Sequence, residues 1–547
     1  MIAENKFSLP HLSAFSTFRS LSHVSFITAA LALSACGGGG GGGSDRGSVT
    51  VGGTGGSNWT AGVFQPSKNF AARCATPRTG IDAFTGEAYP DQPGSATSEN
   101  NWLRSWTHEL YLWYGEVPDL DPAAYTTANY FPLLKTSAKT TSGNSKDKFH
   151  FTYTTAQWRA LSQSGVEASY GAQWIITQPL PPRELLIKYT DPNSPAAAAS
   201  LARGASVIAI DGIDLVNTNV SSQIDAINAA ITPDTPGESH TFTVLDQGSS
   251  TPRAVTLTSA NVTSTPVQNV HTIATGSGAV GYLLFNDHIA TSEQQLINAV
   301  TALKGGAGIT DLVLDIRYNG GGYLDIASEL AYMIAGPTAT AGKAFETLQF
   351  NDQHPTTDPV TGETLAPVPF HSTTQGFTTG LAAGQALPTL NLSRVFVLTS
   401  AETCSASESV INSLRGINVS VIQIGATTCG KPYGFYPQDN CGTTYFSIQF
   451  KGVNNLGFGD YTDGFAPINT ASTQTTTLPG CSVADDFSHA LGDAAEGRLA
   501  AALNYRNTQA CPAASGFSAR GLKQQNDTGA ELLLTPKSPW HGNRILR

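Results

Sequence analysis

A serine at a strand-to-helix junction is the first residue that could perform chemistry. Residues 399–408 have the sequence TSAETCSASE and lie between a predicted strand, 395–398, and a predicted helix, 409–414. At a helix N-terminus, free backbone N–H groups and the helix dipole stabilise a developing negative charge. Ser405 is therefore a candidate nucleophile, and the alternative is that it only caps the helix.

A lysine follows the next predicted strand, 419–424. Residues 425–431, GATTCGK, come one βα unit after Ser405, so their loop is expected at the same sheet edge. A desolvated lysine has a lowered pKa and can accept the serine proton as a neutral amine. The segment also approaches a phosphate-binding loop, but residue 432 is proline and the magnesium-binding hydroxyl is missing. We therefore favour Lys431 as a general base.

A glycine-rich segment leaves a third predicted strand, 311–316. Residues 315–322 have the sequence DIRYNGGG. Glycines after a strand let a backbone N–H approach a reacting carbonyl closely. The alternative is a tight turn without a chemical role.

The N-terminus predicts export. Residues 24–33 form an apolar run too short to span a bilayer, and the following LSAC, residues 33–36, resembles the lipobox of bacterial lipoproteins. The resemblance implies a signal peptide over 1–36, lipidation of Cys36 and, because Gly37 follows, an outer-membrane location in the cell envelope. Residues 37–72 begin with a Gly/Ser-rich stretch and are predicted to be a tether. The net charge of −11 argues against nucleic acid as a partner.

Six further cysteines predict disulfides, because an exported chain meets an oxidising environment. The first expected pair is Cys429 with Cys441. No Cys-x-x-Cys pair is present, so a zinc site is not predicted. Cys404 as a nucleophile would need a nearby histidine, and a disulfide role is favoured instead.

The chain divides into four further regions. Residues 73–166 are predicted to be helical, with Trp102, Trp106, Leu110 and Trp113 at helical spacing. Residues 167–262 are predicted to form short strands and turns, and residues 263–511 alternate strands and helices, which indicates a mainly parallel sheet. Residues 512–547 are polar and predicted to be disordered.

Residues 194–212, SPAAAASLARGASVIAIDG, resemble the PDZ domains of bacterial proteases. The resemblance implies that residues 167–262 are PDZ-like and receive an extended C-terminal peptide as an added strand. Its carboxylate-binding loop would fall at Tyr170, Gly171 and Ala172.

Together the segments resemble the C-terminal processing peptidases, or tail-specific proteases. The matching pieces are the PDZ stretch, LVLDIRYNGGG at 312–322, CSASE at 404–408 and GK at 430–431. The resemblance implies an α/β, crotonase/ClpP-like catalytic core, protein or peptide substrates, and no metal or cofactor. It assigns Ser405 as nucleophile, Lys431 as base, and the N–H groups of Ala406 and of Gly321 or Gly322 as the oxyanion hole.

One position departs from the family. Its members often carry a glutamine four residues after the lysine, and this chain has Phe435; Gln438 is the nearby candidate for orienting the lysine. Phe435 also leaves open a catalytically impaired, surface-anchored peptide-binding protein.

Two other hydrolase types are alternatives to this interpretation. A tricorn-type relative would use a histidine base, but His271, His288 and His371 lie in no matching motif. A Ser-x-x-Lys hydrolase is excluded, because residues 145–148 lie in a polar loop without a Lys-Thr-Gly partner.

Overall fold

The computed structural model describes residues 59–305, 308–470, 475–512 and 544–545. The predicted signal peptide with Cys36, and the predicted tether as far as residue 58, lie outside the described residues. Within the described part of the chain, no helix is both long and apolar enough to cross a membrane.

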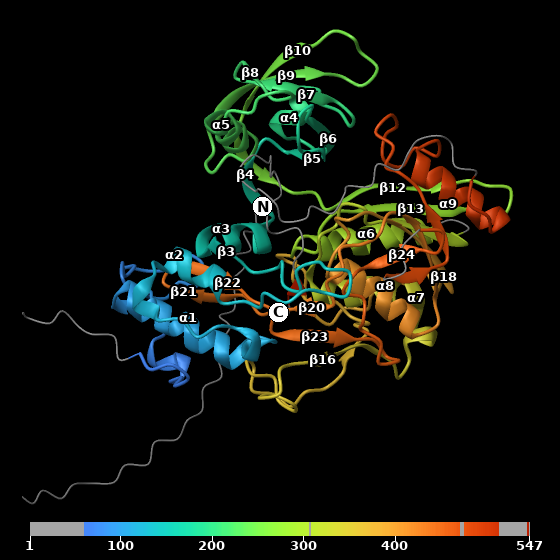
Figure 1. Ribbon diagram of the computed structural model, residues 1–547. Coiled ribbons are helices and arrows are strands. Elements are labelled where there is room, and N and C mark those ends of the chain that lie inside the picture. The colour runs from blue at the N-terminus through green and yellow to red at the C-terminus, as the bar shows by residue number, and fades with distance from the viewer. Residues whose placement is uncertain (1–58, 306–307, 471–474, 513–543, 546–547) are drawn as a thin grey trace, which may run out of the picture. The chain divides into compact units, whose positions relative to one another are not determined.

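A six-stranded sheet forms the centre of residues 263–511 (Figure 1). In spatial order its strands are β12 (Val267–Ile273), β13 (Val280–Phe285), β14 (Asp311–Asp315), β18 (Arg394–Thr399), β19 (Ser420–Gly425) and β26 (Gly480–Ser482). Strand β12 is antiparallel to β13, and the other neighbours are parallel. The predicted mainly parallel sheet is therefore confirmed.

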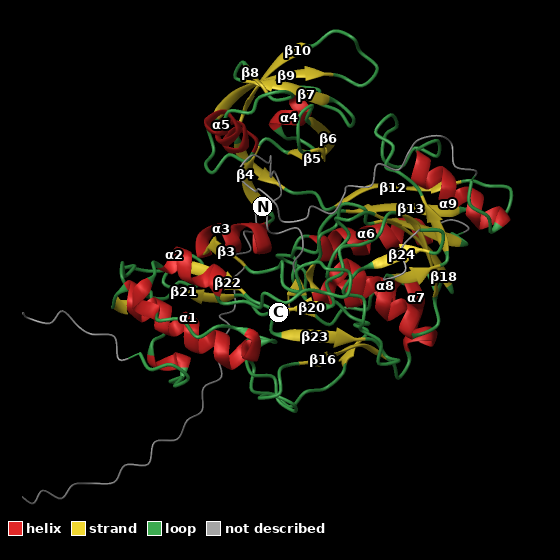
Figure 2. Ribbon diagram, in the orientation of Figure 1, coloured by secondary structure: helices red, strands yellow, loops and turns green. Residues whose placement is uncertain are grey.

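Helices cover both faces of this sheet (Figure 2). They are α6 (Ser292–Lys304), α7 (Leu324–Thr340), α8 (Ala406–Gly416) and α9 (Gly497–Thr508). Side chains of β13 alternate between two cores: Leu283 and Phe285 pack with α6, α7 and α8, whereas Tyr282 and Leu284 pack with α9. Burial on both faces explains the continuous apolar sequence of the central strands.

The strand register fixes where the chemical segments emerge. Thr399 at the end of β18 pairs with Gly425 at the end of β19, and Asp315 at the end of β14 pairs with Leu398. Because these strands are parallel, the loops that follow them leave the same edge of the sheet. The expectation that the Ser405 and Lys431 loops share an edge is confirmed.

Several smaller sheets accompany the central one. One contains β17 (Val368–Pro369), β16 (Ala344–Gln349), β23 (Phe450–Val453) and β20 (Tyr433–Gly434), another β21 (Gln438–Asn440), β22 (Thr443–Phe446) and β3 (Phe151–Thr154), and a third β24 (Phe465–Pro467) and β25 (Thr476–Leu478). Strand β15 (Gly322–Tyr323) pairs in parallel with β27 (Arg544–Ile545). Residues 513–543 and 546–547 of the tail predicted to be disordered lie outside the described residues, so the disorder of 512–547 stays a prediction.

The region 73–166 is only partly helical. Its helices are α1 (Ala96–Leu110), α2 (Thr127–Tyr130) and α3 (Thr155–Arg159), with 3₁₀ turns at Tyr114–Glu116, Pro122–Ala124 and Phe131–Leu133 and a π turn at Ala160–Ser164. It also contains β1 (Arg73–Cys74), β2 (Gln92–Pro93) and β4 (Val166–Ser169), and a 3₁₀ turn precedes it at Ser67–Asn69. Trp113 lies beyond α1, because the Leu112 amide donates to the Ile448 carbonyl and draws the chain out of the helix.

Residues 167–262 have a sheet and an apolar core of their own. The sheet order is β10 (Arg253–Thr258), β9 (Ser239–Leu245), β7 (Ser206–Ile210), β6 (Glu184–Thr190) and β5 (Ala172–Gln178), with β8 (Ile213–Asp214) paired to β7. Helices α4 (Pro195–Ala198) and α5 (Ser221–Ile231) complete it, and β11 (Ala260–Thr263) pairs with β4. Strand β5 is an edge strand of this sheet.

Candidate active site

Ser405 lies between β18 and α8 in a strained backbone conformation. Its φ and ψ angles are 61° and −117°, and the residue is fully buried. The next residue, Ala406, is the first of α8, so its amide has no carbonyl partner within the helix. Strained conformations of this kind persist only where the surrounding structure enforces them. Here Cys404 donates its amide to the Asn319 carbonyl.

Lys431 is enclosed by aromatic rings. The residue is fully buried in the loop between β19 and β20, and its Nζ lies 4.7 Å from the ring centroid of Phe149 and 4.6 Å from that of Phe435. Both separations are within the range of a cation–π contact. Phe435 therefore occupies a position beside the lysine amine, and its ring packs against Phe151 and Phe446.

A carboxylate that the sequence did not single out joins the two loops. Glu408 Oε2 accepts hydrogen bonds from the backbone amides of Ser405 (3.0 Å) and Lys431 (2.8 Å), and Oε1 accepts from the Gly430 amide (2.9 Å) and the Thr428 hydroxyl. Burial raises the pKa of Glu408 above its ordinary value, while these donors oppose the shift. The available signal was the Ser-x-x-Glu spacing of a helix capping box.

A disulfide joins the same loops. Cys404, beside Ser405, is bonded to Cys429, and the Cys429 amide donates to the Thr403 carbonyl. We call the residues that meet here the Ser–Lys junction: Cys404, Ser405, Glu408, Cys429, Gly430 and Lys431.

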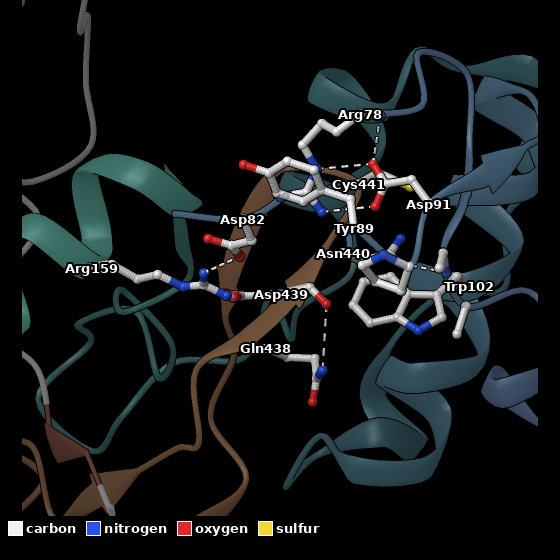
Figure 3. Close-up of a pocket in the computed structure, with 13 residues that line it drawn as sticks. Arg78, Asp82, Tyr89, Asp91, Trp102, Arg159, Gln438, Asp439, Asn440 and Cys441 are labelled. Atoms are coloured by element: carbon white, nitrogen blue, oxygen red, sulfur yellow. Dashed lines mark hydrogen bonds and ion pairs between the residues drawn. The ribbon is translucent and has the colours of Figure 1, made fainter. Parts of the chain in front are cut away.

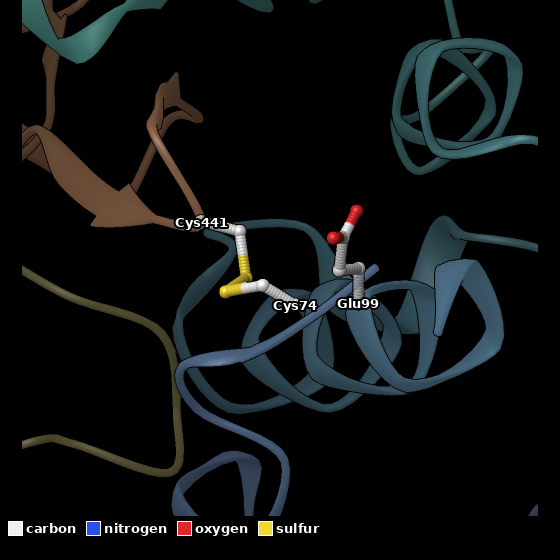
Figure 4. Close-up of side chains that lie close together, drawn as sticks. All are labelled: Cys74, Glu99 and Cys441. Carbon is white, nitrogen blue, oxygen red and sulfur yellow. A yellow bond between two sulfur atoms is a disulfide. The ribbon is translucent and has the colours of Figure 1, made fainter. Parts of the chain in front are cut away.

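The expected Cys429–Cys441 pair is wrong. Cys441 lies in the turn between β21 and β22 and bonds to Cys74 beside Glu99 (Figure 4), and the third bridge joins Cys481 to Cys511. Two groups of cysteine and glutamate among the described residues, Cys404–Glu408–Cys429 and Cys74–Glu99–Cys441, have ligand atoms close together, and in both the cysteines are disulfide-bonded.

The glycine segment narrows the candidates for an oxyanion hole. The Gly321 amide donates to Asn319 Oδ1 at 2.9 Å, so the predicted contact from Gly321 does not hold in this structure. Gly322 has φ 133°, and a Cβ there would lie 2.4 Å from the His288 carbonyl oxygen. This close approach requires glycine at position 322. Gly322 and Ala406 remain as candidate donors.

Residues 279–435 match the sequence profile of peptidase family S41. Residues 279–435 form an S41 domain. A carboxyl-terminal-processing protease of Picosynechococcus sp. is 29% identical over 177 residues, a match that covers 32% of this chain and 41% of that protein. The crystal structure of a candidate S41 protease from Bacteroides fragilis is similar at a TM-score of 0.56 and 23% identity, over 78% of this chain and 99% of that one. The mixed α/β fold is thus shared with that structure.

One histidine lies at the glycine segment of the S41 domain. The Asn319 amide group donates to the Phe285 carbonyl, so Asn319 Oδ1 is the acceptor that faces His288 Nδ1 at 2.9 Å. His288 Nδ1 therefore carries the proton in this hydrogen-bond network. Burial lowers the pKa of His288 to about 3, which keeps the imidazole neutral.

The other two histidines considered from the sequence have separate partners. His371 contacts Asp325, and His271 contacts the Asn269 carbonyl. Neither contact involves a residue of the Ser–Lys junction.

A group of charges follows β14 in the S41 domain and extends beyond it. Arg317 is fully buried and pairs with Asp315 (2.9 Å), Asp485 (2.7 Å) and Glu496 (2.7 Å). We call these four residues the ion cluster. Burial alone would raise the pKa of Asp485, but the surrounding guanidinium groups, that of Arg317 among them, lower it far below its ordinary value.

The region 167–262 contacts the ion cluster and the loop that precedes Ser405. Arg203 pairs with Asp485 of the ion cluster at 2.7 Å. Lys188 pairs with Glu402, three residues before Ser405, at 3.0 Å.

The position of Gln438 does not support its predicted role in orienting Lys431. It lies on β21 and lines a pocket of about 300 Å³ together with Arg78, Asp82, Arg159 and Asp439 (Figure 3). Its amide group contacts the Asp439 carbonyl at 3.5 Å. The pocket's arginines are themselves paired, Arg78 with Asp91 and Arg159 with Asp82 and Asp439. Its charges are thus largely compensated within the protein.

The predicted carboxylate-binding loop is largely engaged by its own domain. The Tyr170 hydroxyl donates to the Ala230 carbonyl, and the Gly171 amide donates to the Ser169 hydroxyl. Ala172 begins β5 and pairs with Thr190. These contacts give no support to capture of a chain end at Tyr170, Gly171 and Ala172.

Proposed function

We propose that this chain is a serine endopeptidase that cleaves exported or unfolded proteins near their C-termini through a Ser405–Lys431 dyad. The observation that carries the proposal is the Glu408 carboxylate, which accepts the backbone amides of both Ser405 and Lys431 and so ties the two loops to one point. Ser405 also precedes a helix whose first amide, on Ala406, has no carbonyl partner within the helix, and we propose this amide as a donor to the developing oxyanion.

The reaction would proceed through an acyl-enzyme. Neutral Lys431 takes the proton of Ser405 Oγ as this oxygen attacks the scissile carbonyl, and the amides of Ala406 and Gly322 stabilise the oxyanion. The protonated lysine gives its proton to the leaving amine. In the second step Lys431 takes a proton from water, the resulting hydroxide attacks the ester, and the proton returns to Ser405 Oγ.

The test compares single substitutions in the full chain. Ser405→Ala removes the nucleophile and is expected to lower kcat for an unfolded protein substrate by about a million-fold. Lys431→Ala is expected to abolish measurable turnover as well. Ser413→Ala, a buried serine on the same helix α8, and Lys451→Ala, a half-buried lysine on β23, serve as matched controls that keep wild-type kcat.

Two results would contradict the dyad. Full activity in the Ser405→Ala variant would exclude Ser405 as the nucleophile. Full activity in the Lys431→Ala variant would show that another group acts as the general base. A loss in His288→Ala alone, with a folded protein, would favour the histidine-based alternative. An inactive wild type would favour the peptide-binding alternative.

We propose further that residues 167–262 are a PDZ-like domain and that residues 263–511 are a crotonase/ClpP-like core. The edge strand β5 supports the first proposal, because an extended peptide can add to an unpaired strand edge. Peptides with free and amidated C-termini separate strand addition from capture of the chain end. If the terminal carboxylate is read, amidation raises KM by about ten-fold; equal KM values would exclude that reading.

The anchor is proposed from the sequence alone. Cys36 would carry lipid and hold the enzyme at the outer membrane, at its periplasmic face or the cell surface, with residues 37–72 as a tether. Cys36→Ser is expected to move the protein from the membrane fraction to the soluble fraction. Unchanged fractionation would contradict lipidation at this residue.

A further inference from the structure

We propose that the Cys404–Cys429 disulfide is a positioning element of catalysis, and that its reduction disables hydrolysis while the protein stays folded. The inference rests on the proposed Ser405–Lys431 dyad. The disulfide joins the segment that carries Ser405 to the segment that carries Lys431.

The bond lies beside both members of the dyad. Cys404 immediately precedes Ser405, and Cys429 lies two residues before Lys431. The segment between the two cysteines contains all of α8 and β19. The disulfide therefore ties the two ends of this βα unit, where the nucleophile and base are found. A displacement of either loop would have to stretch or twist a covalent bridge.

Ser405 needs such a constraint. Its φ of 61° is unfavourable for a residue with a side chain, and strained conformations persist only when the surroundings over-determine them. Two noncovalent contacts at Cys404 and Cys429 contribute: the Cys404 amide donates to the Asn319 carbonyl, and the Cys429 amide donates to the Thr403 carbonyl. The disulfide is the covalent part of this restraint.

The noncovalent link between the loops depends on a buried carboxylate. Glu408 holds the Ser405 and Lys431 amides, but burial raises its pKa, so its charged form is disfavoured in this environment. Without the disulfide, the loops would depend on hydrogen bonds to a group whose ionisation is itself costly. The covalent bridge fixes the geometry that allows these hydrogen bonds to form.

The other two disulfides provide an internal contrast. Cys74–Cys441 joins β1 to the turn after β21, and Cys481–Cys511 joins β26 to the chain after α9. None of these four cysteines belongs to the Ser–Lys junction. Their removal should affect stability without a specific effect on kcat.

The reduction is a two-electron step. A dithiol reductant attacks one sulfur, and the mixed disulfide is resolved by the reductant's second thiol. The S–S bond accepts two electrons and two protons and becomes two thiols, and the reductant becomes a cyclic disulfide. Cys429 is partly exposed, whereas Cys404 is 3% exposed, so the Cys429 side of the bond offers the approach.

The experiment uses the full chain and two double variants. Cys404→Ala/Cys429→Ala is expected to lower kcat by about 100-fold, the loss that a displacement of about 1 Å can cause in an active site. KM should stay within about two-fold, since neither cysteine belongs to β5, the edge strand proposed to bind the peptide. The matched control, Cys481→Ala/Cys511→Ala, should keep wild-type kcat although it too loses one disulfide.

Reduction of the wild type gives a second, independent measurement. Activity should fall in proportion to the free thiol at Cys404 and Cys429, quantified by alkylation and mass spectrometry, and should return on re-oxidation. Circular dichroism must show a folded protein throughout. A chelator is present, because the two thiols and the Glu408 carboxylate are close enough to hold a metal ion. In the Cys481→Ala/Cys511→Ala variant the dependence on reductant should persist.

Three outcomes would overturn the proposal. They are wild-type kcat in the folded Cys404→Ala/Cys429→Ala variant, an equal loss of kcat in the Cys481→Ala/Cys511→Ala control, and a loss of activity that follows unfolding instead of thiol content. If the first variant does not fold, the reduction series decides. An inactive wild type, or an active Ser405→Ala variant, would refute the proposed function instead.

Discussion

The Ser–Lys junction and the ion cluster compensate buried negative charge in opposite ways. In the junction, Glu408 is surrounded by backbone amides and one hydroxyl. In the ion cluster, Arg317 contacts three carboxylates at 2.7 to 2.9 Å. The pKa of Glu408 is raised by burial, whereas the pKa values of Asp485 and Glu496 are lowered because the attraction of guanidinium groups outweighs burial.

Each arrangement constrains a different part of the protein. A carboxylate that accepts amides from two loops specifies the positions of those loops, because hydrogen bonds to backbone N–H groups are directional. A guanidinium among carboxylates compensates their charge strongly, but it joins side chains and does not specify the positions of backbone loops. We therefore expect changes in the junction to act mainly on turnover, and changes in the ion cluster to act mainly on stability.

Removal of the cluster's central cation should have the largest effect. Arg317→Met leaves Asp315, Asp485 and Glu496 buried without this partner, which is expected to lower the free energy of unfolding by about 3–5 kcal/mol. Chemical denaturation measures the change. Arg394→Met is the control, because the Arg394 side chain is 36% exposed and its partner Asp311 keeps a second cation, Arg506. Its loss should cost at most about 1 kcal/mol. Equal losses in the two variants would contradict the assignment of the cluster as a buried, mutually compensated group.

The same substitution in both regions should separate turnover from stability. Glu408→Gln removes an oxygen acceptor between the loops and should lower kcat by about 100-fold. Its stability should change by less than about 1.5 kcal/mol, because the lost hydrogen bonds are offset by burial of a neutral group. Glu496→Gln should behave in reverse, with a clear loss of stability and nearly wild-type kcat. Steady-state kinetics gives kcat, and chemical denaturation gives the free energy of unfolding, for each of the two variants. A similar loss of kcat in both would show that the two regions do not differ as argued.

The sequence predicted the central sheet well, because its signals are local. The predicted strands 311–316, 395–398 and 419–424 match β14, β18 and β19 to within one residue at each end, since each is a short apolar run. The predicted helix through Trp113 failed because a tertiary hydrogen bond, from Leu112 to Ile448, competes with the helix. Such partners are distant in sequence and leave no local pattern.

The candidate site was predictable in its motifs and not in its connections. The sequence singled out Ser405, Lys431 and the glycine segment, and the shared sheet edge follows from parallel strands. The role of Glu408 could not be derived, because its contacts with Gly430 and Lys431 depend on the fold of the next loop. The Cys404–Cys429 disulfide could not be derived either, because spacing alone does not determine how six cysteines pair.

The two regions should respond to acid with opposite signs. The folded-state pKa of Glu408 lies above its ordinary value of 4.5. Its stabilising contribution is therefore complete below 4.5 and is lost as pH rises through the raised pKa. Asp485 and Glu496 have lowered pKa values, so their contributions are complete above their ordinary values and are lost only as pH falls through the lowered ones.

Glu408 therefore links stability to pH in a measurable way. Each unit by which its pKa is raised corresponds to about 1.4 kcal/mol. The wild type should gain stability relative to Glu408→Gln as pH is lowered toward 4.5, while its kcat declines because a protonated Glu408 holds fewer amides. Thermal denaturation and kcat measured over the same pH series test this. A stability difference that does not change with pH would place the Glu408 pKa near its ordinary value.

The smallest effect is expected from the ring beside Lys431. Phe435→Leu leaves an apolar side chain but removes the ring whose centroid lies 4.6 Å from Lys431 Nζ. The smaller side chain should cost about 1–2 kcal/mol of stability, less than truncation to alanine. If the ring also holds the amine in place, kcat falls by about ten-fold, which corresponds to about 1.4 kcal/mol.

Phe345→Leu is the matched control for this ring. Phe345 is equally buried, but it packs in the core beneath the sheet with Phe370 as its aromatic neighbour. It should lose similar stability and keep wild-type kcat. If both variants keep kcat, Phe435 contributes packing alone, and the position of Lys431 depends on the Glu408 carboxylate and the disulfide. If only Phe435→Leu loses turnover, the apolar contact of this ring helps to position Lys431, together with the hydrogen bonds of the Ser–Lys junction.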